Sequence, residues 1–204
     1  WDQIDPATSG RVGGFDVAVL TAPGVPMVAV PKPSASGGGA PARVAAAFEV
    51  APGPFSMKYT ARAEDQSAMD TWTQSLMAPD WGASALAIST PRFFLARSLP
   101  ELRAIRASPD PPPSAVRQFR RSDRVLVTVE CYTLKPDAAP VLQAHILTRE
   151  GRELTELPVP ALENGAVRFE LPVGSLGQGT YILRVRATQG TDQAEDMTAI
   201  VVAR

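Results

Sequence analysis

The chain has 204 residues, 45% of them hydrophobic, and its 20 Lys and Arg nearly balance its 21 Asp and Glu. A chain of this length and composition can bury a core. Its near-zero net charge gives no field of one sign that would recruit nucleic acid or an anionic membrane surface. No run of 18 apolar residues occurs, so the sequence predicts a folded protein without a membrane-spanning helix.

Twenty Pro and 15 Gly lie scattered between short apolar runs. This is typical of many short strands joined by tight turns, because long helices do not tolerate it. Arg outnumbers Lys by 17 to 3, which with the many Ala and Pro indicates GC-rich bacterial coding. The chain opens with Trp1 and has no signal-peptide pattern behind it, so we expect a processed chain or a piece of a longer one.

Alternation of apolar and polar residues predicts twelve strands in two groups. The first group holds five strands, at Phe15–Leu20, Met27–Val30, Arg43–Val50, Phe55–Ala63 and Ala68–Met77. The second group holds seven, at Ala85–Ser89, Arg124–Tyr132, Val141–Arg149, Glu153–Val159, Ala166–Leu171, Tyr181–Thr188 and Glu195–Val202. Such spacing is typical of β-sandwiches.

We therefore predict an all-β fold of two tandem β-sandwich modules, immunoglobulin- or fibronectin III-like, with one short helix. The modules are expected at 1–80 and 81–204, because Pro and Gly interrupt the strand pattern at 78–82. Trp81 then lies at the module junction. The Gly-rich stretch at 33–41 lacks the Lys-Ser/Thr of a phosphate-binding loop and is interpreted as a flexible surface loop.

A helix followed by a Pro-rich strap is predicted at 98–121 in the second module. Ser98 and Glu101 have the spacing of a capping box, and the helix should end before Pro109. The prolines after it predict an extended, solvated strap that leads into the strand at Arg124. Leu102 and Ile105 form one apolar stripe, so the segment is expected to brace a sandwich flank.

Two stretches of the chain repeat one pattern, Gly53–Ala61 and Gly179–Ala187. Each has Gly, then an aromatic residue, an aliphatic one, a basic one and a final Ala at matching positions. The pattern fits the same late strand of two sandwiches, with Gly at a tight entry turn. In the second copy, Gly179 and Tyr181 predict a tyrosine corner, in which the hydroxyl group bonds a nearby backbone group.

From about residue 51 onward the chain resembles the C-terminal region of bacterial VWFA-related domain proteins, in which β-sandwich modules follow a von Willebrand factor A-type domain. The resemblance lies in five stretches, Phe48–Gly53, Ala78–Trp81, Phe94–Ala104, Phe119–Val127 and Leu176–Arg184. It implies an exported, envelope-associated protein. The A-type domain itself is absent, since Asp65–Met69 lacks the second serine of the metal-binding motif, and no metal site is carried over.

No pattern in the sequence predicts a catalytic centre. Common hydrolase and zinc-peptidase motifs are missing, and His145, the only histidine, falls on the solvent face of its strand. Cys131 shares a strand face with three valines, so we expect a buried, inert thiol. Trp1, Trp72 and Trp81 could form a sugar-binding platform, but packing explains Trp72 and Trp81 equally well.

The densest basic stretch gives one candidate interaction patch, made of Arg97, Arg103, Arg106, Arg117, Arg120 and Arg121. These side chains, with Arg124, could bind a carboxylate or phosphate, or could pack over the module junction and pair with nearby acids; the second reading is favoured.

The sequence therefore predicts a non-catalytic structural or protein-interaction module of an exported protein. We expect a protein partner or self-association, and no cofactor, small-molecule ligand, nucleic acid or membrane insertion. The alternatives are a carbohydrate-binding sandwich and a subunit that assembles by strand addition. The expected location is extracytoplasmic: periplasm, cell surface or secreted.

Overall fold

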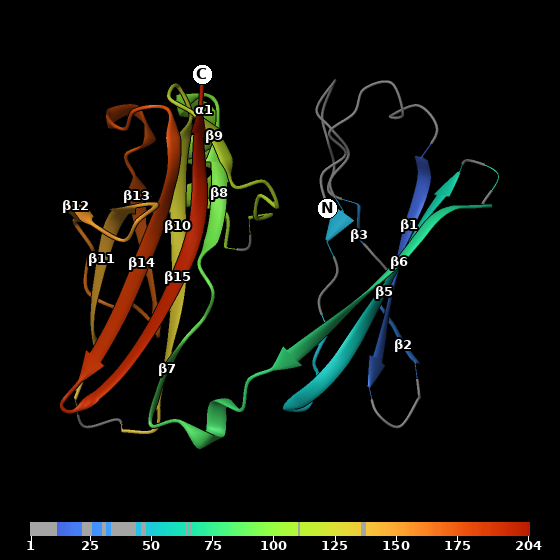
Figure 1. Cartoon of the computed structure of the whole chain (residues 1–204), viewed down its shortest axis with the longest axis horizontal. Helices are drawn as coiled ribbons and strands as arrows, with labels where there is room; N and C mark the ends of the chain where they lie inside the picture. The colour runs from blue at the N-terminus through green and yellow to red at the C-terminus, as the bar shows by residue number, and fades with distance from the viewer. Residues whose placement is uncertain are drawn as a thin grey trace. The chain divides into compact units, whose positions relative to one another are not determined.

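The computed structural model describes residues 12–21, 26–29, 32–33, 44–45, 48–63, 65, 67–109, 111–135 and 138–204. The chain divides into two compact units, Trp1–Asp80 and Trp81–Arg204. Strands make up most of the described residues, as the all-β prediction requires (Figure 1). Among these residues, no helix is long and apolar enough to cross a bilayer.

The first unit contains one four-stranded antiparallel sheet in the order β2-β1-β5-β6. Its strands are β1 (Val12–Thr21), β2 (Pro26–Ala29), β5 (Gly53–Ala63) and β6 (Ala68–Ala78). A two-stranded ladder joins β3 (Lys32–Pro33) to β4 (Val44–Ala45). The strand expected at 43–50 is therefore shorter than predicted, because residues 48–50 lie outside any strand.

Alternation places the apolar side chains of the first sheet on one face. Val17 and Ala61 are buried there, and Met57 and Tyr59 pack against them. The strand β5 begins at Gly53, whose φ of 123° disfavours other residues. The first copy of the repeated sequence pattern thus forms β5, and its glycine is the first residue of the strand.

The second unit is a sandwich of two sheets with one α-helix. Its elements are β7 (Leu86–Ile88), β8 (Arg92–Ala96), α1 (Leu99–Ala107), β9 (Gln118–Arg120), β10 (Arg124–Thr133), β11 (Val141–Thr148), β12 (Glu153–Leu157), β13 (Ala166–Leu171), β14 (Gly179–Gln189) and β15 (Asp192–Ala203). One sheet centres on β10, which pairs with β13 on one side and with β7 and β8 on the other. The other has the order β12-β11-β14-β15-β9 (Figure 1).

The core of the second unit lies between these two sheets. Alternate residues of each strand point inward, and the largest fully buried side chains include Phe93, Phe119, Ile146, Leu183 and Ile200. They form one continuous apolar cluster. Such a core supplies the main stabilisation of a domain of this size.

The helix α1 covers the outer side of the β8–β10 pair. Its N-cap is Ser98, whose Oγ accepts a hydrogen bond of 3.3 Å from the Glu101 backbone N–H. It ends at Ala107, with Ser108 as C-cap before Pro109, so the predicted helix is confirmed. Leu102 is buried against Phe94, Ala96 and Leu126, a small second core.

The strap after the helix is only partly solvated. Pro112 and Pro113 are exposed, as predicted, whereas Pro111 and Ser114 are buried, and the Ser114 backbone N–H donates to the Phe93 carbonyl oxygen at 2.7 Å. The strap leads first into β9, which pairs in parallel with β15. This bond and a second one, from the Val201 N–H to the Arg117 carbonyl oxygen at 2.9 Å, dock the segment on the sandwich.

Candidate functional site

Three of the six candidate arginines hold the second unit together. Arg106 forms an ion pair with Glu170 of β13. The Arg117 guanidinium lies 5.0 Å from the centre of the Phe93 ring, a cation–π contact. Arg121 Nη2 donates to the Gly174 carbonyl oxygen at 3.1 Å.

The other three candidate arginines, Arg97, Arg103 and Arg120, are exposed. Within the described part of the chain, their side chains make no hydrogen bond or ion pair. The nearby acids serve the backbone instead: Glu101 accepts from the Arg97 N–H and Asp123 from the Arg120 N–H, each at 2.7 Å. Half of the predicted patch therefore contacts the second unit itself, and the other half is exposed to solvent.

Cys131 lies in the main core and is 7% exposed. It follows Val125, Val127 and Val129 on the inward face of β10, in the register that alternation gives. Burial raises the pKa of its thiol. The thiolate is therefore scarce at neutral pH, and Cys131 acts as a small apolar side chain.

Tyr181 stands at the start of β14, where its ring packs against the main core. Its hydroxyl group donates a hydrogen bond of 3.0 Å to the Gly177 carbonyl oxygen. Gly179 has a φ of 156°, and a Cβ atom placed there would lie 3.8 Å from Tyr181 Cε2, in ordinary contact with the ring. This is the geometry of a tyrosine corner.

His145 lies on the outer face of β11, the face that alternation predicts, and is half-buried there. Its cross-strand neighbours on that face are Glu156 and Arg184. Among the described atoms, His145 Nδ1 and Arg184 Nε are buried without a hydrogen-bond partner. Arg184 also pairs with Glu153, so this row of polar side chains is mainly a cross-strand ladder.

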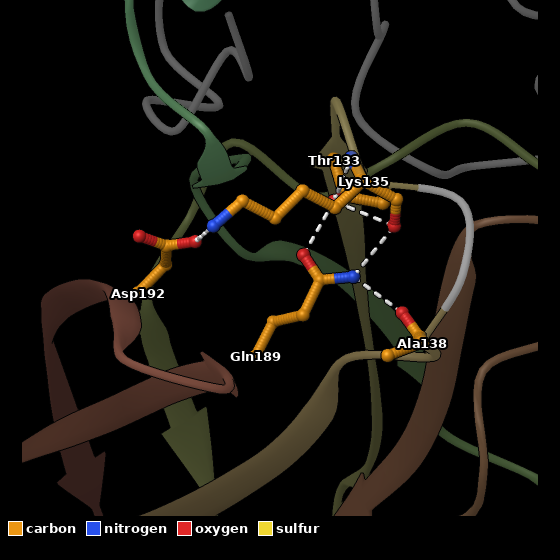
Figure 2. Close-up of polar contacts among 5 residues, drawn as sticks. All are labelled: Thr133, Lys135, Ala138, Gln189 and Asp192. Carbon is orange, nitrogen blue, oxygen red and sulfur yellow. Dashed lines mark hydrogen bonds and ion pairs between the residues drawn. The ribbon is translucent and has the colours of Figure 1, made fainter.

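A polar clamp around Gln189 joins the loop after β10 to the β14–β15 hairpin (Figure 2). Gln189 is 5% exposed, and its Oε1 accepts from Thr133 Oγ1 at 2.5 Å. Its Nε2 donates to the carbonyl oxygens of Lys135, at 2.8 Å, and Ala138. Lys135 Nζ forms an ion pair with Asp192 beside it. The clamp uses the amide for internal bonds, which fits a structural role.

An exposed aromatic pair lies at the start of the second unit. Trp81 and Tyr132 are 43% and 44% exposed, with ring centres 5.4 Å apart and planes tilted by 43°. The Tyr132 hydroxyl group donates to Glu130, which raises the pKa of Tyr132 to about 12, and Glu130 forms an ion pair with Arg92. By contrast, Trp72 stacks on Tyr59 in the first sheet, at 4.9 Å and 14°. Trp1 lies outside the described residues.

The edge strand β6 is a feature that the sequence analysis missed. It is exposed over most of its eleven residues and pairs, among the described strands, with β5 alone. It has no charged residue from Thr71 to Ala78. That uncharged run is the signal that could have revealed an unprotected edge.

No group of three or more His, Cys, Asp or Glu that could hold a metal ion occurs among the residues that the structure describes. Asp65, in the stretch nearest to a metal-binding motif, accepts bonds from Ser67 through its N–H at 2.9 Å and its Oγ at 2.5 Å. These bonds lower the pKa of Asp65 and form a local turn.

No protein-family model matches the chain, and no curated protein matches it. Among solved structures, it is similar to a tetra-tandem repeat in the extending region of a large adhesion protein, at 15% identity and a TM-score of 0.27. That match covers 91% of this chain and 41% of the other. It is also similar to fibronectin(III)-like modules of CbhA from Clostridium thermocellum, at 12% identity and a TM-score of 0.28, covering 99% and 94%. Because both TM-scores are low, the proposals below rest on this chain's own residues.

Proposed function

We propose that this chain is a non-catalytic structural and protein-interaction module of an exported bacterial envelope or extracellular protein. The observation that carries the proposal is the exposed, uncharged run of β6 from Thr73 to Ala78, a strand that pairs, among the described strands, with β5 alone. An edge strand presents a row of backbone donors and acceptors on which another chain can add a strand. The resemblance to VWFA-related proteins supports the exported location.

The second unit supports this proposal through the way it uses its polar groups. Its buried polar side chains include Gln189, which clamps a loop, and Ser114 and Thr198, which bond within the fold. Cation–π and ion-pair contacts fix the helix and strap. Polar groups used in internal bonds in this way support a structural module.

The proposal is tested by placing a photo-cross-linking amino acid at Gln74, in β6, within the bacterium of origin. A matched variant carries the same group at Gln143, an exposed residue of β11 that pairs with Arg186 of β14. We expect protein adducts from Gln74 outside the cytoplasm and few from Gln143. Equal, weak cross-linking at both positions, or a cytoplasmic location, would contradict the proposal.

A carbohydrate-binding module is the second candidate, and the Trp81–Tyr132 pair favours it. Exposed aromatic faces pack against the C–H groups of sugar rings, and Glu130 and Arg92 lie beside them as hydrogen-bonding groups. Calorimetric titration with bacterial and plant polysaccharides tests this function. Binding that Trp81→Ala abolishes and Trp72→Ala retains would establish it, whereas no binding by the unaltered protein would exclude it for those sugars.

A further inference from the structure

We propose that Asn164 and Gly165 form a site of spontaneous modification, at which the asparagine loses its amide and the main chain rearranges to isoaspartate. Asn164 is the one asparagine in the sequence, and a glycine follows it directly. Asparagine is among the thermolabile residue types. The inference goes beyond the proposed function and does not depend on it.

The two residues form the tip of a tight turn in front of β13. Both have positive φ angles, 52° at Asn164 and 77° at Gly165. Glu163 and Ala166, on either side, exchange two backbone hydrogen bonds, of 2.8 and 3.0 Å. Positive φ at both central residues is the mark of a type I′ turn, for which Asn-Gly is a preferred sequence. The turn thus explains why this pair of residues stands here.

The atoms that would react are accessible. Asn164 and Gly165 are both exposed. Gly165 has no side chain to shield its nitrogen, and within the part of the chain that the structure describes its N–H donates to no protein group. Attack of this nitrogen on Asn164 Cγ closes a five-membered ring, so the geometry of the side chain favours the reaction.

The reaction needs water and hydroxide and no other reagent. Hydroxide removes the Gly165 amide proton, and the nitrogen forms a bond to Asn164 Cγ. The Cγ–Nδ2 bond then breaks, and ammonia leaves with a proton from water, which regenerates hydroxide. Water next opens the succinimide ring. Cleavage of the new Gly165 N–Cγ bond gives aspartate, whereas cleavage of the original Gly165 N–C bond gives isoaspartate, whose main chain runs through Cβ and Cγ.

The closed turn slows the attack without preventing it. The two turn bonds restrict the rotation of Asn164 that brings its Cγ onto the Gly165 nitrogen, so the turn must open first. These bonds form an isolated bridge between Glu163 and Ala166. An exposed turn with few contacts opens at a small cost compared with a whole domain. The folded protein should therefore lose the amide more slowly than the unfolded chain, but without global unfolding.

The two products affect the fold differently. The Gly165 carbonyl oxygen accepts a bond of 2.7 Å from the Cys131 N–H of β10, and Ala166 lies opposite Glu130 in the β10–β13 ladder. Isoaspartate adds one carbon atom to the main chain of a two-residue turn, whose length sets how its flanking residues pair. The Cys131 bond should therefore weaken. Aspartate keeps the main chain and only adds a charge.

Incubation of the intact, folded chain at mildly alkaline pH, followed by tryptic digestion and mass spectrometry, tests the proposal. Peptide 153–168 carries Asn164, and peptide 169–184 carries Gln178, which also precedes a glycine. We expect a gain of about 1 Da in the first peptide only, since a glutamine must close a less favourable six-membered ring. The gain should be faster at higher pH and in urea. A folded protein that keeps its amide while the unfolded chain loses it overturns the proposal.

Two variants provide the matched controls. Asn164→Gly keeps a sequence that suits a type I′ turn and has no amide to lose, so peptide 153–168 should keep its mass. Asn164→Asp reproduces the aspartate product. Thermal unfolding checks that both variants are folded. A gain of mass that persists in Asn164→Gly would place the reaction elsewhere and overturn the proposal.

The isoaspartate product is detected by methylation with a protein isoaspartate methyltransferase. Incubated protein should accept a methyl group, whereas Asn164→Asp should not. Hydrogen exchange at the Cys131 amide should also be faster in the isoaspartate form than in Asn164→Asp, because only the first lengthens the turn. A protein that gains mass but accepts no methyl group, or equal exchange at Cys131 in the two forms, overturns the rearrangement of the main chain.

Discussion

The Tyr181 hydroxyl group bonds the Gly177 carbonyl oxygen at 3.0 Å, across the turn that leads into β14. The ring of Tyr181 packs on the core while its polar tip fixes the turn. Gly179, with a φ of 156°, lies next to the ring, so the turn brings the tyrosine within reach of Gly177. The corner sets where β14 begins, and so the register of the longest hairpin in the second unit.

Tyr181→Phe should lower the free energy of unfolding by about 1 kcal/mol, the usual net contribution of one hydrogen bond. The freed Gly177 carbonyl is exposed and can bond water, which limits the loss. Tyr181→Ala should cost about 3–5 kcal/mol, since it also leaves a cavity. Denaturant unfolding of the two variants measures both values; unchanged stability in Tyr181→Phe would contradict a corner role.

Cys131 should react with a thiol reagent only after the protein unfolds, because the core covers its Sγ atom. Its raised pKa also links stability to pH. The unfolded chain loses the thiol proton near pH ~8.5, before the folded protein does. The stabilising contribution is therefore complete below that pH and is lost as pH rises through the folded pKa.

Comparison with Cys131→Ala isolates this effect, since the other titrating groups are common to both proteins. Between pH 7 and 10, the free energy of unfolding should fall more steeply for the unaltered protein than for Cys131→Ala. Rapid labelling without denaturant, or parallel pH profiles, would contradict the buried position.

Leu102→Asp should destabilise the second unit by about 3 kcal/mol or more, because it places a carboxylate against Phe94 and Leu126. Arg103→Glu, on the exposed side of the same helix, should change stability by about 0.5 kcal/mol or less. Arg106→Glu should cost up to about 1 kcal/mol, since it loses a surface ion pair with Glu170. Equal effects of Leu102→Asp and Arg103→Glu would show that the helix is not docked.

Gln189→Leu should destabilise the second unit by about 2–3 kcal/mol, since it leaves Thr133 and two loop carbonyls without their amide partner. Hydrogen exchange should then speed up at Lys135 while the centre of β10 keeps its protection. Lys135→Ala removes only the exposed ion pair with Asp192 and should cost less than about 1 kcal/mol. Unchanged exchange at Lys135 in the Gln189 variant would contradict the clamp.

Alternation in the sequence predicted the strands that have one buried and one solvated face, such as β14 and β15. It missed β8, because both of its faces are buried: Phe93 points into the main core, and Phe94 lies under α1. It missed β9 because three residues are too few to show alternation of apolar and polar positions. The strand with which β9 pairs, β15, is also distant in sequence. The buried Pro111 was unexpected for the same reason, since the strap meets the sandwich through the Ser114–Phe93 bond and through β9, which join residues distant in sequence.

The interaction surface was less predictable than the fold. Charge density pointed to the arginines, yet Arg106, Arg117 and Arg121 contact the unit itself. These guanidinium groups contact an aromatic ring, a carboxylate and a backbone carbonyl of residues that are distant in sequence, so their partners could not be predicted from the sequence. The exposed edge of β6 depends on which strands flank it, a property of topology that no local pattern encodes.

The most direct test of the central claim is backbone hydrogen exchange in β6, measured for the purified chain alone and after mixing with the exported-protein fraction of the bacterium of origin. Amides between Thr73 and Ala78 that are not bonded to β5 should exchange more slowly in the mixture. Amides of β11 that are bonded to β14 should be unaffected. Slowing confined to β6 is the predicted result; equal exchange in β6 with and without the fraction would contradict the claim that this strand is an interaction surface.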